Sequence, residues 1–194
     1  MRTAFGDFDV TPEVVSGDVE AQLSFVGATG DLRAAQLPGP YLVVDLGGGS
    51  TELVRGFDAV EAGRSLDVGS VRLTERHLHS DPPTVDEIDN ATVDVELALT
   101  RAAEDVDLRG IGTVVGLAGS ITTITAFVLD LPSYQPERIH LGELTVEDHQ
   151  LACTRLLTMT RAERAALGFM HPGRVDVIGA GALVWQLVLA RVAS

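Results

Sequence analysis

The spacing of apolar residues divides this chain into short strands and longer helices. Short runs of apolar and β-branched residues predict strands, whereas apolar residues at every third or fourth position predict helices. The predicted strands lie at residues 41–46, 50–56, 64–69 and 112–117. The predicted helices begin near Asp18 and continue at residues 71–78, 85–104, 121–126, 145–158, 160–167 and 173–192.

Polar and small residues mark several helix features within this pattern. Thr84, with Glu87 three residues later, has the sequence signature of a capping box. The apolar face of the first helix is predicted at Val19, Leu23 and Val26. Residues 179–182, Gly-Ala-Gly-Ala, fall within the last predicted helix, where glycines cost helix propensity. Such small residues permit the close approach of a neighbouring element or a ligand.

A glycine turn between the first two predicted strands is the most informative segment of the chain. Gly47, Gly48 and Gly49 allow positive φ and bring bare amides close to a ligand. Successive amides of this kind form an anion-binding concavity. Asp45 precedes the turn, and Ser50 and Glu52 follow it. An anion beside two carboxylates requires a cation, so the segment predicts a phosphate on the turn with Mg²⁺ bridging to a carboxylate.

The alternative interpretation of this segment is a plain β-hairpin. Three glycines between alternating hydrophobic residues suit such a turn, and the glycines alone favour it. The complete unit from Asp45 to Glu52 favours the phosphate site, because a hairpin requires neither carboxylate.

Composition narrows the functional class. The 194 residues are enough for one domain with a sizeable core, and the net charge of −14 argues against a nucleic-acid or anionic-membrane binder. No segment approaches the ~20 apolar residues of a membrane helix, and the N-terminus has no signal-peptide core. Cys153 is the only cysteine and lies in a helical apolar pattern, which predicts a buried thiol. These features together predict a cytoplasmic protein.

A second glycine motif follows the strand at residues 112–117. Gly116, Gly119 and Ser120 lie where this strand turns into the next predicted helix, and a helix N-terminus can hold a phosphate. The Gly-Lys-Ser/Thr element of a P-loop is missing. Close packing of the strand on the helix explains these small residues equally well.

Several motifs in this order resemble the exopolyphosphatase / guanosine pentaphosphate phosphatase (Ppx/GppA) family. They are residues 14–21, 43–53, 67–73 and 115–120, together with residues 170–181. The resemblance implies an α/β fold, namely an actin-like (ribonuclease H-like) ATPase domain with a mixed sheet flanked by helices. It also implies that water hydrolyses the terminal phosphoanhydride bond of polyphosphate or guanosine pentaphosphate, with Mg²⁺ as cofactor.

The resemblance assigns roles to individual residues. Glu20 matches the general base, and Asp45 and Glu52 match the carboxylates that hold metal and water. The predicted phosphate-binding residues are Gly47, Gly48, Gly49, Ser50, Gly116, Gly119 and Ser120.

The resemblance also implies that residues 1–194 form a single domain, equivalent to the second domain of the family. The Asp-x-Gly-Thr-Asn-Ser motif of the first domain is missing, and the C-terminus stops before the segment that usually completes the second. Because half of the donors around the phosphoryl group are then lost, we expect this chain alone to be weak or inactive. An exposed cleft wall also predicts that a homodimer can form.

Two other functional classes stay open. One is a non-catalytic phosphate- or nucleotide-binding module, or a regulatory half-protein that pairs with a full-length partner. The other is an ATP-dependent kinase of the actin-like superfamily, which Glu20 combined with Asp45 and Glu52 makes less favoured. Polyphosphate is preferred over guanosine pentaphosphate, because the sequence has no guanine-reading feature.

Overall fold

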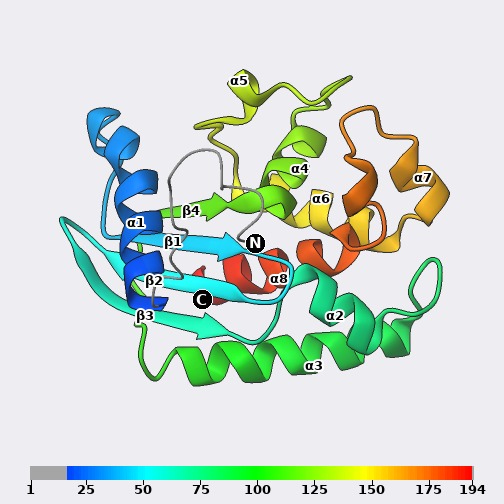
Figure 1. Cartoon of the computed structure of the whole chain (residues 1–194), viewed down its shortest axis with the longest axis horizontal. Coiled ribbons are helices and arrows are strands. Elements are labelled where there is room, and N and C mark those ends of the chain that lie inside the picture. Colours follow the sequence, from blue (N-terminus) through cyan, green and yellow to red (C-terminus); the bar gives the residue numbers. More distant parts are fainter. Residues whose placement is uncertain (1–16, 194) are drawn as a thin grey trace, which may run out of the picture.

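One mixed sheet organises the chain, and its strands follow the order β3-β2-β1-β4 (Figure 1). The structure is a computed structural model that describes residues 17–193. The strands are β1 (Tyr41–Leu46), β2 (Thr51–Gly56), β3 (Val60–Leu66) and β4 (Thr113–Leu117). β1 pairs antiparallel with β2 and parallel with β4, and β2 pairs antiparallel with β3.

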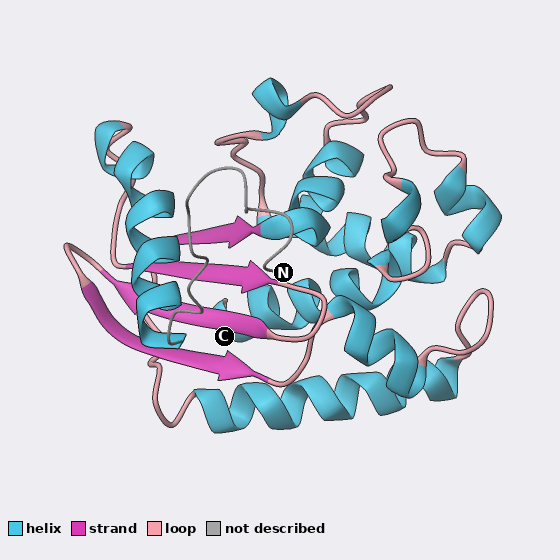
Figure 2. Cartoon of the chain, in the orientation of Figure 1, coloured by secondary structure: helices cyan, strands magenta, loops and turns pink. Residues whose placement is uncertain are grey.

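Helices cover both faces of this sheet (Figure 2). On one face lies α1 (Gly17–Ala34). The other longer helices are α2 (Ser70–His77), α3 (Val85–Ala102), α4 (Ala118–Val128), α6 (Val146–Thr158) and α8 (Ile178–Val192). Three shorter elements are α5 (Pro136–Ile139), α7 (Arg161–Ala165) and the 3₁₀ helix η2 (Pro172–Arg174).

The alternation of side chains along β1 divides the core into two layers. Leu42 and Val44 join a large cluster with α2, α3, α4, α6 and α8. Tyr41 and Val43 face the other way and pack in a smaller cluster with Phe25 of α1. Successive residues of a strand point to opposite faces, so the apolar run of β1 is buried on both.

The strands predicted at 41–46, 50–56 and 112–117, the helix cap at Thr84 and the buried cysteine are confirmed. The strand predicted at 64–69 instead spans Val60–Leu66, since residues 67–69 form the connection to α2. Thr84 Oγ1 accepts a hydrogen bond from the Glu87 amide, and a Glu87 carboxylate oxygen accepts one from the Thr84 amide at 2.8 Å. The Cys153 side chain is fully buried, and burial raises its thiol pKa to about 12. Within the described residues, no helix combines the length and apolar composition needed to cross a membrane.

Two helix predictions were wrong in detail. The predicted apolar face of the first helix points outward, with Leu23 64% and Val26 62% exposed, because α1 packs on the sheet through Phe25 and Leu32 instead. The last helix begins at Ile178 rather than near residue 173. The small residues 179–182 therefore form its first turn.

Candidate functional site

The glycine turn between β1 and β2 is hydrogen-bonded to the N-terminus of α2. The Gly47 carbonyl accepts a hydrogen bond from the Ser70 amide at 3.0 Å. The Gly48 carbonyl accepts bonds from the amides of Val71 at 2.9 Å and Arg72 at 3.0 Å. The first amides of a helix have no partner within it, so the turn satisfies those of α2 and is fixed by them.

The glycines of the turn serve close approach rather than positive φ. The φ angles of Gly47, Gly48 and Gly49 lie outside the left-handed region, so the expectation of positive φ was wrong. A Cβ placed on Gly69, just before α2, would lie 2.6 Å from the Gly48 carbonyl and from the Ser50 amide nitrogen. Only a residue without a side chain fits there, because the backbones of turn and helix touch.

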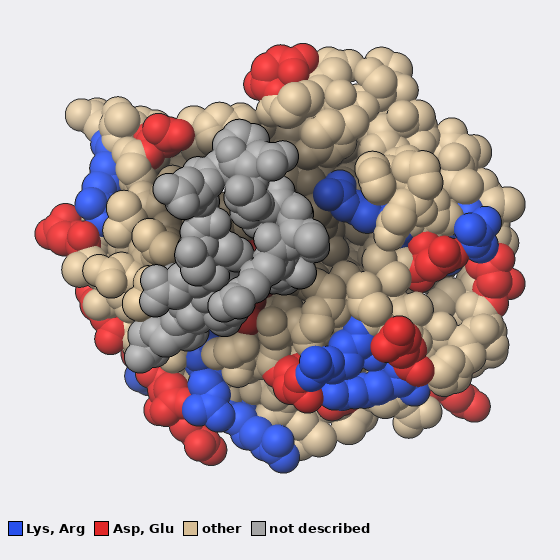
Figure 3. All heavy atoms as spheres, in the orientation of Figure 1, with Lys and Arg blue, Asp and Glu red and all other residues tan. Residues whose placement is uncertain are grey.

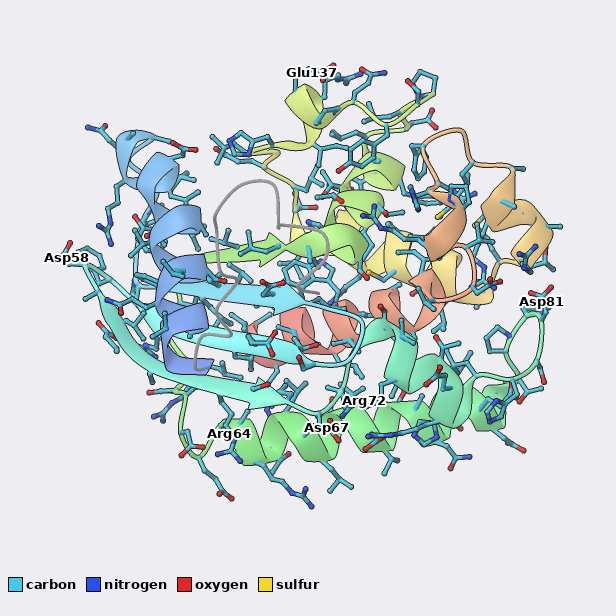
Figure 4. The ribbon with its side chains drawn as sticks, viewed as in Figure 1. Asp58, Arg64, Asp67, Arg72, Asp81 and Glu137 are labelled. Carbon is cyan, nitrogen blue, oxygen red and sulfur yellow. The ribbon has the colours of Figure 1, made fainter. Side chains whose placement is uncertain are left out.

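Three amides of the turn have no backbone acceptor in the described part of the chain. Within residues 17–193, the amides of Gly48, Gly49 and Ser50 donate to no backbone carbonyl. Arg72 lies beside them and forms an ion pair with Asp67 (Figure 4). Figure 3 shows basic and acidic side chains gathered together over α2 and α3 on this face. The turn therefore has a basic neighbour whose charge is already balanced, and anion binding by the turn stays a prediction.

The two predicted metal ligands lie directly opposite each other in the β1–β2 pair. Asp45 is in register with Glu52, and both are half-buried. Because Asp45 lies two residues from Val43 and Glu52 lies two residues from Val54, and both valines belong to the smaller cluster, both carboxylates project on the α1 face of the sheet. The Ser65 hydroxyl donates a hydrogen bond to Glu52 Oε1 at 2.9 Å, which orients that carboxylate.

This donor set fits Mg²⁺. Like charges directly opposite each other in a sheet destabilise it, so a cation between Asp45 and Glu52 relieves their repulsion. The described residues contain no group of three or more His, Cys, Asp or Glu side chains that could hold a metal. Two carboxylates completed by water and substrate phosphate are the usual Mg²⁺ environment in phosphoryl-transfer sites.

The side chain of Glu20, the predicted general base, lies outside the described part of the structure. The next residue, Ala21, lies over β3, since its Cβ is 4.0 Å from the position of a Cβ on Gly63. Gly63 opposes Val54, two residues along β2 from Glu52. The start of α1 thus lies over the same face as the two carboxylates, and a catalytic role for Glu20 stays a prediction.

The second glycine motif forms a strained turn from β4 into α4. Ala118 has a φ of 69°, in the left-handed region that costs a residue with a side chain roughly 1–2 kcal/mol. A Cβ on Gly119 would lie 2.3 Å from the guanidinium of Arg174. Arg174 Nη1 donates to Thr123 Oγ1 at 3.3 Å, and within the described residues its guanidinium pairs with no carboxylate. A cation therefore lies over the N-terminus of α4.

Gly116 and Ser120, by contrast, occupy packed positions. A Cβ on Gly116 would lie 2.6 Å from the Ile121 side chain and 3.0 Å from the Trp185 ring. Ser120 is 7% exposed and lies against Gly181 of α8. Close packing of strand and helices, the explanation that the sequence left open, accounts for both residues. Their contact with phosphate stays a prediction.

The two glycine motifs meet at one edge of the sheet. β1 and β4 are parallel neighbours with Asp45 opposite Leu117, so the turns that follow them leave the sheet side by side. A Cβ on Gly181 would lie 2.6 Å from Ser120 Oγ and 3.4 Å from Ser70 Cβ. The small first turn of α8 thus lets the N-termini of α2 and α4 converge.

Sequence reasoning gave Arg174 no role. The residue lay within the family-like run 170–181, which was the only signal available. Its position over Gly119 depends on η2, whose N-cap His171 accepts a hydrogen bond at Nδ1 from the Gly173 amide at 3.1 Å. No local pattern predicts a contact between residues so far apart along the chain.

Comparisons with known proteins agree with this geometry. A family model described as the Ppx/GppA phosphatase family matches residues 2–193. Exopolyphosphatase 2 of Mycobacterium tuberculosis is 51% identical over 172 residues, which cover 89% of this chain and 53% of that protein. The chain therefore spans about half the length of this curated relative.

Solved structures give the same result. The crystal structure of an exopolyphosphatase-like protein matches with a TM-score of 0.91 and 46% identity, covering 98% of this chain and 61% of that one. The crystal structure of an Aquifex aeolicus member of the Ppx/GppA family matches with a TM-score of 0.85 and 27% identity, covering 100% of this chain and 61% of that one.

Proposed function

This chain belongs to the Ppx/GppA phosphatase family, with the expected actin-like mixed-sheet fold, and we propose that it forms one wall of a site that hydrolyses the terminal phosphoanhydride bond of inorganic polyphosphate. One observation carries the proposal. The amides of the glycine turn, the opposed carboxylates of Asp45 and Glu52, and Arg174 over the α4 N-terminus all lie where parallel β1 and β4 end.

Each part has a role in phosphoryl transfer. The loose transition state of such reactions needs positioning and charge stabilisation more than covalent chemistry. The amides of Gly48, Gly49 and Ser50, together with the Arg174 guanidinium, would hold the oxygens of the terminal phosphoryl group. Mg²⁺ held by Asp45 and Glu52 would supply positive charge against the phosphate oxygens.

The proposed reaction is a hydrolysis. A water oxygen forms a bond to the terminal phosphorus while the bridging P–O bond breaks, which releases orthophosphate and a polyphosphate one unit shorter. Glu20 would accept the proton of the attacking water. Polyphosphate is the favoured substrate because Exopolyphosphatase 2 is the 51% identical relative, and guanosine pentaphosphate is the second candidate.

The alternative is a phosphate-binding half-protein without activity of its own. This alternative is favoured because the chain covers 53% of the length of Exopolyphosphatase 2 and 61% of the length of the solved exopolyphosphatase-like chain. In that case the turn and Arg174 would bind polyphosphate, while hydrolysis would need groups from a further domain or partner.

The test measures binding and phosphate release together. The purified chain is titrated calorimetrically with short polyphosphate, and orthophosphate release is followed with and without Mg²⁺. Arg174→Gln should weaken binding by about 10- to 100-fold, as expected for a lost hydrogen bond to a charged group. Arg101→Gln, which makes the same charge change on the exposed surface of α3, is the matched control.

The possible results separate the two functions. Release that depends on Mg²⁺ and disappears in Glu20→Gln supports hydrolysis by this chain. Binding without release supports the phosphate-binding half-protein. Absence of binding, or equal weakening by Arg174→Gln and Arg101→Gln, contradicts the assigned site.

A further inference from the structure

Arg72 lies at the exposed rim of the glycine turn, next to Gly49. Its backbone amide donates a hydrogen bond to the Gly48 carbonyl at 3.0 Å, which fixes the start of its side chain beside the turn. A Cβ on Gly49 would lie 3.6 Å from Arg72 Nη2, so the guanidinium reaches the exposed part of the turn. The Arg72 side chain is 43% exposed. A cation is therefore held where the turn borders on solvent.

Arg72 belongs to the first turn of α2, where a positive charge is unfavourable. The N-terminus of a helix carries partial positive charge and favours anions. The first turn of α2 contains no acidic residue, and its amides already donate to the carbonyls of Gly47 and Gly48. The neighbouring anion is instead the Asp67 carboxylate, with which Arg72 forms an ion pair (Figure 4). Arg72 therefore requires an anion beside it, and Asp67 supplies one in the protein alone.

Asp67 does not depend on Arg72 for its charge balance. Its Oδ2 atom accepts a hydrogen bond at 3.0 Å from Nη2 of Arg76, which lies one helical turn further along α2. Arg76 Nη1 also donates to Asp94 Oδ2 at 3.0 Å, which connects α2 to α3. Asp67 is 70% exposed, and exposed ion pairs contribute little to stability. Arg72 can therefore leave Asp67 while the carboxylate keeps a partner and the contact between the helices stays intact.

A polyphosphate chain bound at the proposed site has to pass this rim. The proposed function places the terminal phosphoryl group against the turn amides and Arg174, which lies over Gly119 at the end of β4. Arg72 follows β3, at the opposite end of the strand order. The second phosphate is joined to the terminal one by a single bridging oxygen, so it also lies beside the turn. The fork of an arginine guanidinium matches the paired oxygens of such a phosphate.

We propose that Arg72 is a specificity-determining residue, which exchanges its ion pair with Asp67 for the second phosphate of a polyphosphate chain. No covalent bond forms or breaks in this exchange. The chain gains a contact that orthophosphate cannot make, so the site prefers its substrate over its own product. The inference rests on the proposed function, because that function places the terminal phosphoryl group on the glycine turn.

The test measures the affinity of the whole chain for tripolyphosphate by calorimetry and for orthophosphate by phosphorus NMR. Both are measured with Mg²⁺ in a Glu20→Gln background, which should stop the proposed hydrolysis. Arg72→Gln should weaken tripolyphosphate binding about tenfold or more, as expected for a lost hydrogen bond between charged groups. The same substitution should leave orthophosphate binding nearly unchanged, because orthophosphate has no second phosphate.

Arg76→Gln is the matched control. It makes the same charge change in the same helix and removes a partner of the same carboxylate, but Arg76 lies one helical turn away from Arg72. Tripolyphosphate binding should stay nearly unchanged in this variant. Arg101→Gln, on the exposed surface of α3, repeats the control without disturbing the ion pairs of Asp67 and Asp94. It provides the comparison if Arg76→Gln unfolds the chain.

Asp67→Asn should act in the opposite direction. It releases Arg72 and should strengthen tripolyphosphate binding up to about fivefold, the fold-change that corresponds to one exposed ion pair. In the Arg72→Gln background, Asp67→Asn should strengthen binding much less, because the gain acts through Arg72. A double-mutant cycle of the two substitutions separates this effect from the mere loss of a negative charge near the site.

The outcomes separate this inference from the proposed function. Absence of tripolyphosphate binding by the parent protein overturns both. Three results overturn the inference alone and leave the phosphate site in place. They are equal weakening by Arg72→Gln and its controls, equal weakening of tripolyphosphate and orthophosphate binding by Arg72→Gln, and a gain from Asp67→Asn that is unchanged in the Arg72→Gln background.

Discussion

Gly181 is the residue on which the convergence of α2 and α4 depends. A Cβ there would lie 2.6 Å from the hydroxyl of buried Ser120, closer than real Cβ contacts. We predict that Gly181→Ala lowers the free energy of unfolding by about 1–3 kcal/mol, the usual cost of overpacking. Gly30→Ala in α1 meets no atom within 4 Å and should instead raise it by about 0.5–1 kcal/mol through helix propensity. Urea denaturation of both variants checks the pair, and a stabilised Gly181→Ala protein would refute the packing argument.

His149 and Trp185 form a second single-residue test. Trp185 Nε1 donates to His149 Nδ1 at 3.1 Å, so the imidazole is an acceptor and neutral in this pair. Burial lowers the pKa of His149 below its usual 6.5, against an opposing effect of Asp148. Stability is therefore complete above pH 6.5 and falls as the pH drops toward the folded-state pKa, because the unfolded chain takes up the proton first. Denaturation measured between pH 7 and 5, a range that includes the usual histidine pKa of 6.5, should show this loss of stability. His149→Gln should make the loss smaller.

At the level of elements, the capping box of α3 predicts acid sensitivity. The Thr84 amide, followed by the His79 amide and the Ser80 hydroxyl, stabilises the Glu87 carboxylate and lowers its pKa from 4.5 to about 2, although burial opposes this. The stabilisation is present above pH 4.5 and is lost as the pH falls toward 2. Glu87→Gln should remove that part of the pH dependence. Thr84→Ala should cost about 1 kcal/mol near neutral pH, with Thr84→Ser as the control that keeps the cap.

The elements also explain which features the sequence could predict. β1, β2 and the capped start of α3 carry their signals within a few residues, so local patterns locate them. The buried face of α1 is set by Phe25 meeting the sheet, and the apolar residues Leu23 and Val26 point outward instead. Arg174 reaches Gly119 only through the folded chain, so no periodicity or spacing could reveal the contact.

The whole molecule has a large hydrophobic cluster on one face of the sheet and a small hydrophobic cluster on the other. α8 buries ten residues, whereas among the described side chains of α1 the buried ones are Phe25, Thr29 and Leu32. We predict from this difference that amide hydrogens of α1 exchange faster than those of α8, because helices with fewer buried side chains open at lower cost. Mass-spectrometric hydrogen exchange measures both helices in one experiment. Equal protection of the two would show that the smaller cluster is no weaker than the larger one.

The hydrogen bonds between the glycine turn and α2 affect the rate at which a ligand associates. The carbonyls of Gly47 and Gly48 are already engaged by helix amides in the protein alone, so the turn has little conformational freedom left to lose. A ligand that binds there meets amides that are already oriented. Binding therefore carries little entropic cost of ordering the loop. Association of a phosphate chain should then be governed by its diffusion against the field of a protein with a net charge of −14. Added salt, by screening that field, should raise the association rate constant.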